Sequence, residues 1–140
     1  MDQLLALLKA QGPKFLFTPK GMHFTKGAIQ TLKIGASVAA STVRIPPIRD
    51  KIPGHLRQDI LSQSYNLIEM IGRCSFILVL FETQRVAMED SDELIQVFGA
   101  MYLDACRRDD ELRKLCKLTF DTYSDISIEE FGTKTADKEY

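Results

Sequence analysis

Apolar residues recur every three or four positions along much of the chain, which is the spacing of one face of an α-helix. The clearest run predicts a long helix from His55 to about Met88. Its apolar face comprises Ile60, Leu67, Ile71, Cys74, Leu78 and Phe81. Within it the octet CSFILVLF, residues 74–81, is apolar on all sides, and a helix of that kind is normally buried. A buried strand is the competing interpretation of the octet, but the helical spacing that leads into it favours a central helix.

Two further helices are predicted in the C-terminal part of the chain. Residues 89–109 begin with acidic residues that suit a helix N-terminus, and Asp90 or Ser91 can cap that end. Residues 109–125 show the same pattern, in which acidic residues come first and an apolar helical face follows. Ser127 and Glu130 form a capping-box pattern, but Gly132 follows after barely one turn. Residues 133–140 are predicted to be a disordered tail.

The N-terminal part carries a weaker pattern. Residues 2–11 predict a short helix that Gly12 and Pro13 stop. Residues 14–27 predict an extended or irregular segment, because Pro19 and nearby glycines break a helix. Residues 25–44 fit a helix or a strand, and their alanines favour a helix that starts near Thr25 or Thr31. Its buried face would comprise Ile29, Leu32, Ala36, Ala39 and Val43.

Three prolines, at positions 46, 47 and 53, predict a loop over residues 44–54. The expected fold is therefore all-α: a helical bundle around a long central apolar helix at about 55–88, with a less regular basic N-terminal segment. We expect one helical domain over residues 1–132, with a basic part at 1–53 and an acidic helical part at 54–132.

The charge is divided unevenly along the chain. No Asp or Glu occurs in the 47 residues from Gln3 to Arg49. Residues 1–57 hold nine Lys or Arg against two acids, and residues 58–140 hold nine against seventeen, so the net charge of −1 hides a strong asymmetry. This asymmetry indicates either an anionic partner for the basic part or pairing between the two parts.

The stretch KFLFTPKGMHFTKG, residues 14–27, mixes cations with aromatic rings. Lysine and arginine neutralise phosphates, and exposed aromatic rings stack on unpaired bases. The leading hypothesis is a non-enzymatic protein that binds RNA or single-stranded DNA through residues 14–57 and self-associates through other faces. Its contacts would be Lys14, Lys20, Lys26, Lys33, Arg44, Arg49, Lys51 and Arg57, with Phe15, Phe17 or Phe24 stacking if exposed. The alternative is that these phenylalanines are core residues and the lysines are merely solvated.

Other functions fit the same charges. A small helical adaptor would bind another protein, and an anionic membrane surface would attract the basic part. Arg followed four to six residues later by His, here Arg49 and His55, is the signature of a family of helical-bundle ribonucleases. Histidine could take a proton from a ribose 2′-OH and arginine could stabilise phosphate charge. Pro53 and Gly54 lie between them, so the two residues cannot share a helical turn. The alternative is a basic loop followed by a histidine at the start of a helix.

The positions of the cysteines and histidines bear on disulfides, metal binding and cellular location. Cys74, Cys106 and Cys116 are widely spaced and odd in number, which favours reduced core thiols and a cytoplasmic or nuclear location. His23 and His55 lie far apart, with no cysteine close to either, so no metal site and no cofactor are predicted. The octet at 74–81 is too short to span a bilayer, which needs about 20 apolar residues.

Overall fold

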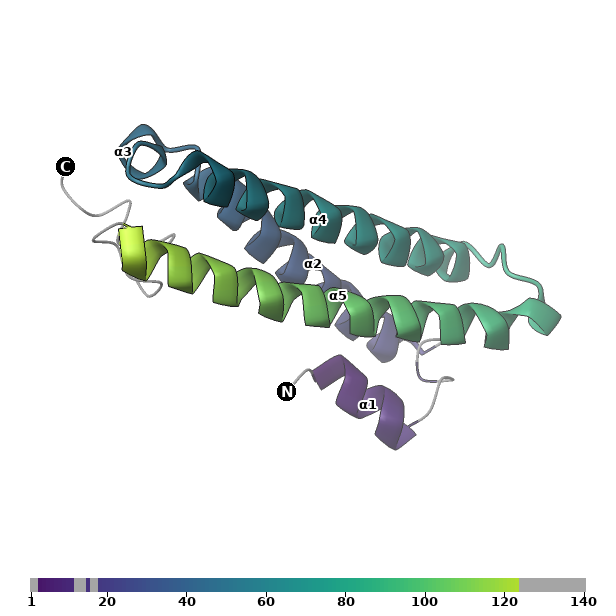
Figure 1. The fold of residues 1–140 in the computed structure, drawn as a ribbon. Helices are drawn as coiled ribbons and strands as arrows, with labels where there is room; N and C mark the ends of the chain where they lie inside the picture. Colours follow the sequence, from purple (N-terminus) through teal and green to yellow (C-terminus); the bar gives the residue numbers. More distant parts are fainter. Residues whose placement is uncertain (1–2, 12–14, 16–17, 124–140) are drawn as a thin grey trace. The chain divides into compact units, whose positions relative to one another are not determined.

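The structure is a computed structural model that describes residues 3–11, 15 and 18–123 (Figure 1). The described residues form helices joined by short turns, and they contain no strand. The helices, in chain order, are α1 (Gln3–Gln11), α2 (Pro19–Thr42), α3 (Pro46–Arg49), α4 (Gly54–Glu82) and α5 (Met88–Tyr123). The helices pack against one another as a bundle, so the predicted all-α fold is confirmed.

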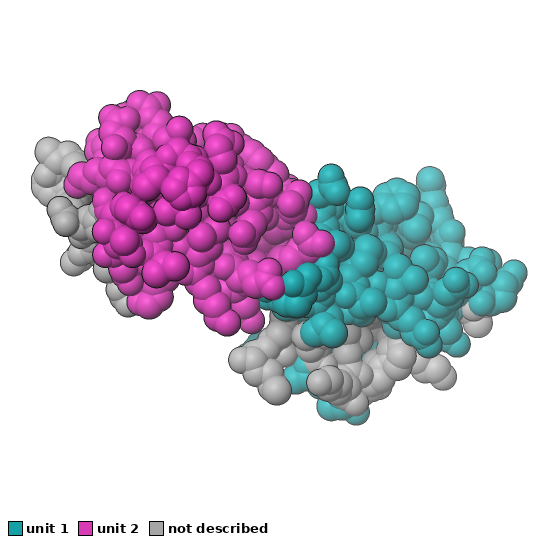
Figure 2. All heavy atoms as spheres, viewed as in Figure 1, with its two compact units in different colours: residues 1–33, 69–107 teal, residues 34–68, 108–140 magenta. Residues whose placement is uncertain are grey.

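The chain folds into two compact units, which Figure 2 shows in different colours. Unit 1 comprises residues 1–33 and 69–107, and unit 2 comprises residues 34–68 and 108–140. Unit 1 therefore holds α1, the first part of α2, the end of α4 and the start of α5. Unit 2 holds the end of α2, α3, the start of α4 and the end of α5.

Helix α1 confirms the short helix predicted at residues 2–11, but α2 begins earlier than predicted. The amide of Gly21 donates a hydrogen bond to the Thr18 hydroxyl oxygen at 2.9 Å, so Thr18 is the N-cap of α2. Pro19 then takes the first helical position, where the missing N–H costs nothing and the fixed φ suits the helix. The predicted irregular segment at 14–27 is therefore wrong from residue 19 onward, since a Thr-Pro start outweighs the breaking tendency of the glycines.

The rest of α2 is the helix that the alanines favour. Its predicted face is buried throughout, with relative exposures of 8% or less. These residues are Ile29, Leu32, Ala36, Ala39 and Val43. Spacings of three and four explain this burial, whereas a strand would have placed alternate residues on opposite sides.

The proline-rich segment holds the short helix α3, so the prediction of a loop is wrong for residues 46–49. Pro46 and Pro47 occupy the first two helical positions, where no backbone N–H is needed. Ile48 and Ile52 are buried and anchor the turn to the core of unit 2. The prolines still prevent α2 and α4 from joining, as expected.

Helix α4 confirms the long apolar helix but ends at Glu82, six residues before the predicted end. The amide of Gln84 donates to the Phe81 carbonyl at 3.1 Å, and that of Arg85 donates to the Leu80 carbonyl at 2.9 Å. Gln84 has a φ of 55°. These are the bonds of a Schellman motif, in which the left-handed position is usually glycine. Because glutamine occupies that position here, the end of α4 carries no sequence signal.

The apolar face of α4 is buried as predicted, but the octet at 74–81 is not buried on all sides. Cys74, Ile77, Leu78 and Phe81 are buried. Phe76 and Val79 are 63% and 48% exposed. The prediction of burial on every side is therefore wrong for one face, because neighbouring helices cover only part of this helix.

Helix α5 is continuous over residues that were predicted as two helices. Its buried positions keep spacings of three and four through the expected break. They are Ile95, Phe98, Tyr102, Ala105, Asp109, Leu112, Cys116, Thr119 and Phe120. The acidic pair at 109–110 indicated a new helix start, yet no glycine or proline interrupts residues 100–123, so the helix continues. The predicted turn at 127–132 and the predicted tail at 133–140 lie outside the described residues.

Candidate nucleic-acid interface

Six of the eight predicted cations are exposed. Arg57 is half-buried, and Lys14 lies outside the described residues. The exposed ones are Lys20, Lys26, Lys33, Arg44, Arg49 and Lys51. They divide between the units, with the lysines of α2 in unit 1 and the cations of residues 44–57 in unit 2.

The three lysines of α2 in unit 1 do not form a continuous cationic face. Lys26 and Lys33 are seven residues apart and share one side of α2, whereas Lys20 points elsewhere. The ammonium of Lys26 forms an ion pair with the Glu82 carboxylate at the end of α4. This pair links α2 to α4 within unit 1 and neutralises one of the three charges.

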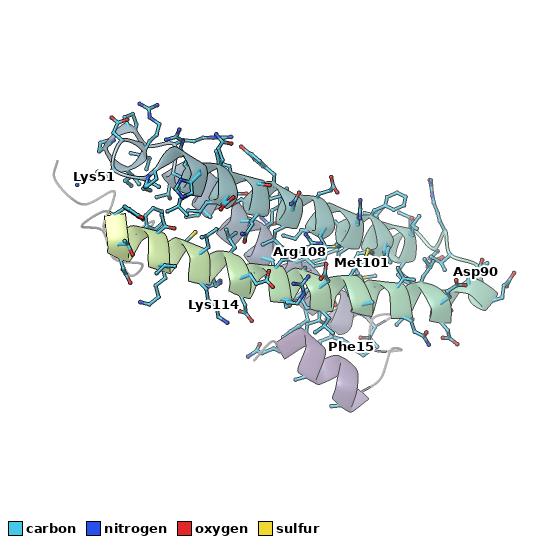
Figure 3. The ribbon with its side chains drawn as sticks, viewed as in Figure 1. Phe15, Lys51, Asp90, Met101, Arg108 and Lys114 are labelled. Atoms are coloured by element: carbon cyan, nitrogen blue, oxygen red, sulfur yellow. The ribbon has the colours of Figure 1, made fainter. Side chains whose placement is uncertain are left out.

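The cations of unit 2 lie along the connection between α2 and α4 and at the start of α4, and we call them the basic corner: Arg44, Arg49, Lys51 and Arg57. The guanidinium of Arg57 donates to the Arg49 carbonyl oxygen at 3.4 Å, so the start of α4 is tied to the end of α3. Lys51 lies in the turn that follows α3 (Figure 3). Within residues 44–57 the only acid is Asp50, which pairs with Arg49 at 3.3 Å. Four cations against one acid give this turn a formal charge of +3.

An aromatic ring that the sequence did not indicate lies beside this corner. The guanidinium of Arg44 lies over the Tyr65 ring, 5.3 Å from its centroid. Tyr65 is 44% exposed. It lies on α4, 21 residues from Arg44, and Arg44 lies in the turn after α2, so only the packing of that turn against α4 in unit 2 brings them together. A guanidinium over an aromatic face makes a cation–π contact.

The three phenylalanines were expected to stack on bases only if they were exposed. Phe15 is buried, with 7% of its surface exposed, so it does not meet the condition for stacking. A Cβ added to Gly21 would lie 2.6 Å and 2.7 Å from two Phe15 ring carbons, which shows how closely this ring packs on α2. Phe24 is half-buried, and Phe17 lies outside the described residues.

Arg49 and His55, the residues of the ribonuclease hypothesis, are both exposed. They make no hydrogen bond to each other; Arg49 instead binds Asp50. Within the described ranges no three His, Cys, Asp or Glu side chains lie close enough to hold a metal ion. Burial raises the pKa of the Cys74 thiol to about 11 and that of the Cys116 thiol to about 12, so both remain protonated near neutral pH.

Helix α4 contains an 18-residue window with a mean hydropathy of 1.4, of which 39% is buried. By length and composition it could cross a membrane, but the core helix of a soluble protein satisfies the same criterion. Comparison with protein-family models, with curated proteins and with solved structures found no match to this chain.

Proposed function

We propose that this protein binds RNA or single-stranded DNA, and that the basic corner of unit 2 is its main contact surface. The observation that carries the proposal is the placement of Arg44, Arg49, Lys51 and Arg57 within residues 44–57, with the exposed ring of Tyr65 against the Arg44 guanidinium. Cations that track a phosphate backbone, together with an aromatic platform for a base, are the two components of single-strand binding.

The local structure supports a preorganised surface. Buried Ile48 and Ile52 hold the turn, and the hydrogen bond from Arg57 to the Arg49 carbonyl holds α3 against α4. When a phosphate binds cations on a fixed turn, less conformational entropy is lost than when mobile lysine side chains must first become ordered. Arginines dominate the corner, and a guanidinium offers planar, bidentate recognition of phosphate and can also stack on bases.

The lysines of α2 would add a weaker, less localised contribution. Lys20 and Lys33 are exposed, whereas the charge of Lys26 is already balanced by Glu82. We therefore assign most of the binding free energy to unit 2, and treat the α2 lysines as additional phosphate contacts.

The proposal is tested with a labelled single-stranded RNA titrated across a salt series. The corner variant combines Arg44→Ala, Arg49→Ala and Lys51→Ala. If each cation neutralises one phosphate, the slope of log K against log salt falls by about 2 in this variant, because each contact contributes about 0.7 for single strands. Binding at low salt should weaken by at least tenfold.

A matched control removes three exposed cations elsewhere, with Arg73→Ala, Arg85→Ala and Arg107→Ala. This control changes the net charge equally, so it separates a local contact surface from general electrostatic attraction. Equal losses in the two triple variants, or no binding by the wild type at low salt, would overturn the proposal.

A second candidate function, a helical adaptor that binds another protein, is favoured by one observation. Phe76 and Val79 are 63% and 48% exposed and lie one turn apart on α4. Exposed apolar groups that adjoin one another are typical of protein-binding surfaces. A photo-crosslinking amino acid at position 76 should capture one recurrent protein in cells, and the same group at exposed position 58 should not. Equal capture at both positions would count against an adaptor.

A further inference from the structure

Unit 2 contains a groove between α2 and α5 that the basic corner does not use. Its volume is about 410 Å³. Its walls are apolar: Gly35, Val38 and Ala39 on α2, and Leu112 and Cys116 on α5. A Cβ added to Gly35 would lie 3.8 Å from an Asp109 carboxylate oxygen and 3.9 Å from an Arg113 guanidinium nitrogen. The two helices are therefore close here, and the missing side chain leaves the space open.

The edge of the groove is cationic. Arg113, Lys114 and Lys117, all exposed, line it together with the buried Asp109. Asp109 accepts a hydrogen bond from the Arg113 guanidinium at 2.9 Å, and Lys117 pairs with Asp121 at 3.4 Å. Lys114, which Figure 3 labels on α5, makes no ion pair with a described residue. The groove thus offers apolar walls and an unpaired positive charge.

The start of α5, in unit 1, presents the complementary pattern on its exposed side. Glu89, Glu93, Ala100 and Leu103 follow one another at spacings of four, seven and three, so they share one face of the helix. Leu103 is 58% exposed, and Val97 beside this face is 42% exposed. Neither glutamate forms an ion pair with a described residue. We call this surface, with Val97, the acidic face.

We propose that the groove of one copy receives the acidic face of a second copy. The apolar side chains of Leu103 and Val97 would contact the apolar walls of the groove. The carboxylates of Glu93 and Glu89 would face its cationic edge, where the ammonium of Lys114 has no ion pair with a described residue. A helix lying in an apolar groove is a recurring mode of recognition, and opposite charges at the edge fix its orientation.

The two surfaces are different parts of the chain, so the contact is heterologous. Such contacts generate a ring when they close and an open chain of subunits when they do not. This inference goes beyond nucleic-acid binding and stands without it, because it uses neither the basic corner nor Tyr65. It names surfaces for the self-association that the sequence hypothesis assigned to faces other than residues 14–57.

Sedimentation velocity without nucleic acid tests the proposal, over a wide range of protein concentrations at low and high salt. The wild type should form larger species as concentration rises, and salt should weaken this association because the edge contacts are ionic. Lys114→Glu and Glu93→Lys should each raise the dissociation constant by about tenfold or more, since like charges then face each other. Arg85→Glu, an exposed charge reversal outside both surfaces, should leave it unchanged.

Mixing the two variants tests directly whether the groove of one chain binds the acidic face of another. The Lys114→Glu chain keeps its acidic face and the Glu93→Lys chain keeps its groove, so an equal mixture should associate at concentrations at which each variant alone stays largely monomeric. Both substituted positions are exposed, and circular dichroism melting checks that the variants are folded. A wild type that stays monomeric, single variants that associate like the wild type, or a mixture that stays monomeric would each overturn the proposal.

Discussion

The guanidinium of Arg44 lies over the ring of Tyr65, with 5.3 Å between its Cζ atom and the ring centroid. This contact joins the turn after α2 to α4 in unit 2 and places an exposed ring against one cation of the basic corner. It combines the two groups that bind unpaired nucleic acid, a phosphate-neutralising cation and a stacking surface. The arrangement leads to the first prediction.

Tyr65→Ala should weaken binding of single-stranded RNA by roughly five- to 150-fold, since stacking on one aromatic ring contributes about 1–3 kcal/mol by alanine substitution. Tyr65→Phe keeps the ring and should bind nearly as well as the wild type. Fluorescence anisotropy with a labelled oligonucleotide measures both. Wild-type affinity in Tyr65→Ala would remove the ring from the interface.

Gly21→Ala should lower the free energy of unfolding, whereas Gly27→Ala in the same helix should raise it. A Cβ at position 21 would collide with the Phe15 carbonyl oxygen and its ring, and such overpacking costs about 1–3 kcal/mol. A Cβ at position 27 meets nothing within 4 Å, so the better helix propensity of alanine should stabilise by about 0.5–1 kcal/mol. Urea denaturation measures both, and effects of the same sign would contradict the packing of Phe15 on α2.

Thr119→Val should stabilise the protein, by about 1 kcal/mol. The Thr119 hydroxyl oxygen is buried and has no hydrogen-bond partner among the residues that the structure describes, and valine has the same shape without the polar group. The control is Thr25→Val, because the equally buried Thr25 hydroxyl donates to the Gly21 carbonyl at 2.7 Å. That variant should lose about 1 kcal/mol. Thermal unfolding of the pair checks the difference, and a less stable Thr119→Val would show that its hydroxyl is satisfied.

Iodoacetamide at pH 8 should label Cys106 well before Cys74 and Cys116. Cys106 is half-buried, whereas burial raises the pKa of Cys74 to about 11 and that of Cys116 to about 12. Only the thiolate reacts, and each unit by which the pKa exceeds the pH lowers its fraction about tenfold. Labelling of the buried pair should therefore rise as pH increases, and become fast on unfolding. Mass spectrometry of the labelled peptides follows each site, and equal rates at Cys106 and Cys116 in the folded protein would refute the prediction.

The helices were predictable where burial follows from spacing alone. The apolar faces of α2 and α4 can be identified from the sequence, and both are buried in the structure. This is because apolar residues three and four positions apart must share one side of a helix. The all-α fold follows from those stripes without any knowledge of how the helices contact each other.

Helix ends were less predictable, for separate reasons. Thr18 and Pro19 did carry a start signal, but the nearby glycines indicated a break. The end of α4 rests on Gln84 in a conformation that usually requires glycine, so the sequence holds no marker for it. Asp109 looked like the start of a new helix, whereas in α5 it is buried within the apolar stripe and bound to Arg113.

In the candidate site, too, some features were predictable from the sequence and others were not. Exposure of the cations at positions 44, 49 and 51 was predictable, because charged side chains are almost never buried without a partner. The contact between Arg44 and Tyr65 and the burial of Phe15 depend on residues from separate segments meeting, which spacing along one segment cannot indicate.

The continuity of α5 fixes the rotational phase of the two halves of this helix. Each residue turns an α-helix by about 100°, so one residue inserted after Arg107 would rotate Leu112 and Cys116 by that angle relative to Phe98 and Tyr102. Substitutions on the exposed side of α5 leave this phase intact, whereas single insertions or deletions do not. Variation in the length of this chain should therefore be confined to the turns between helices, and be absent from the middle of α5.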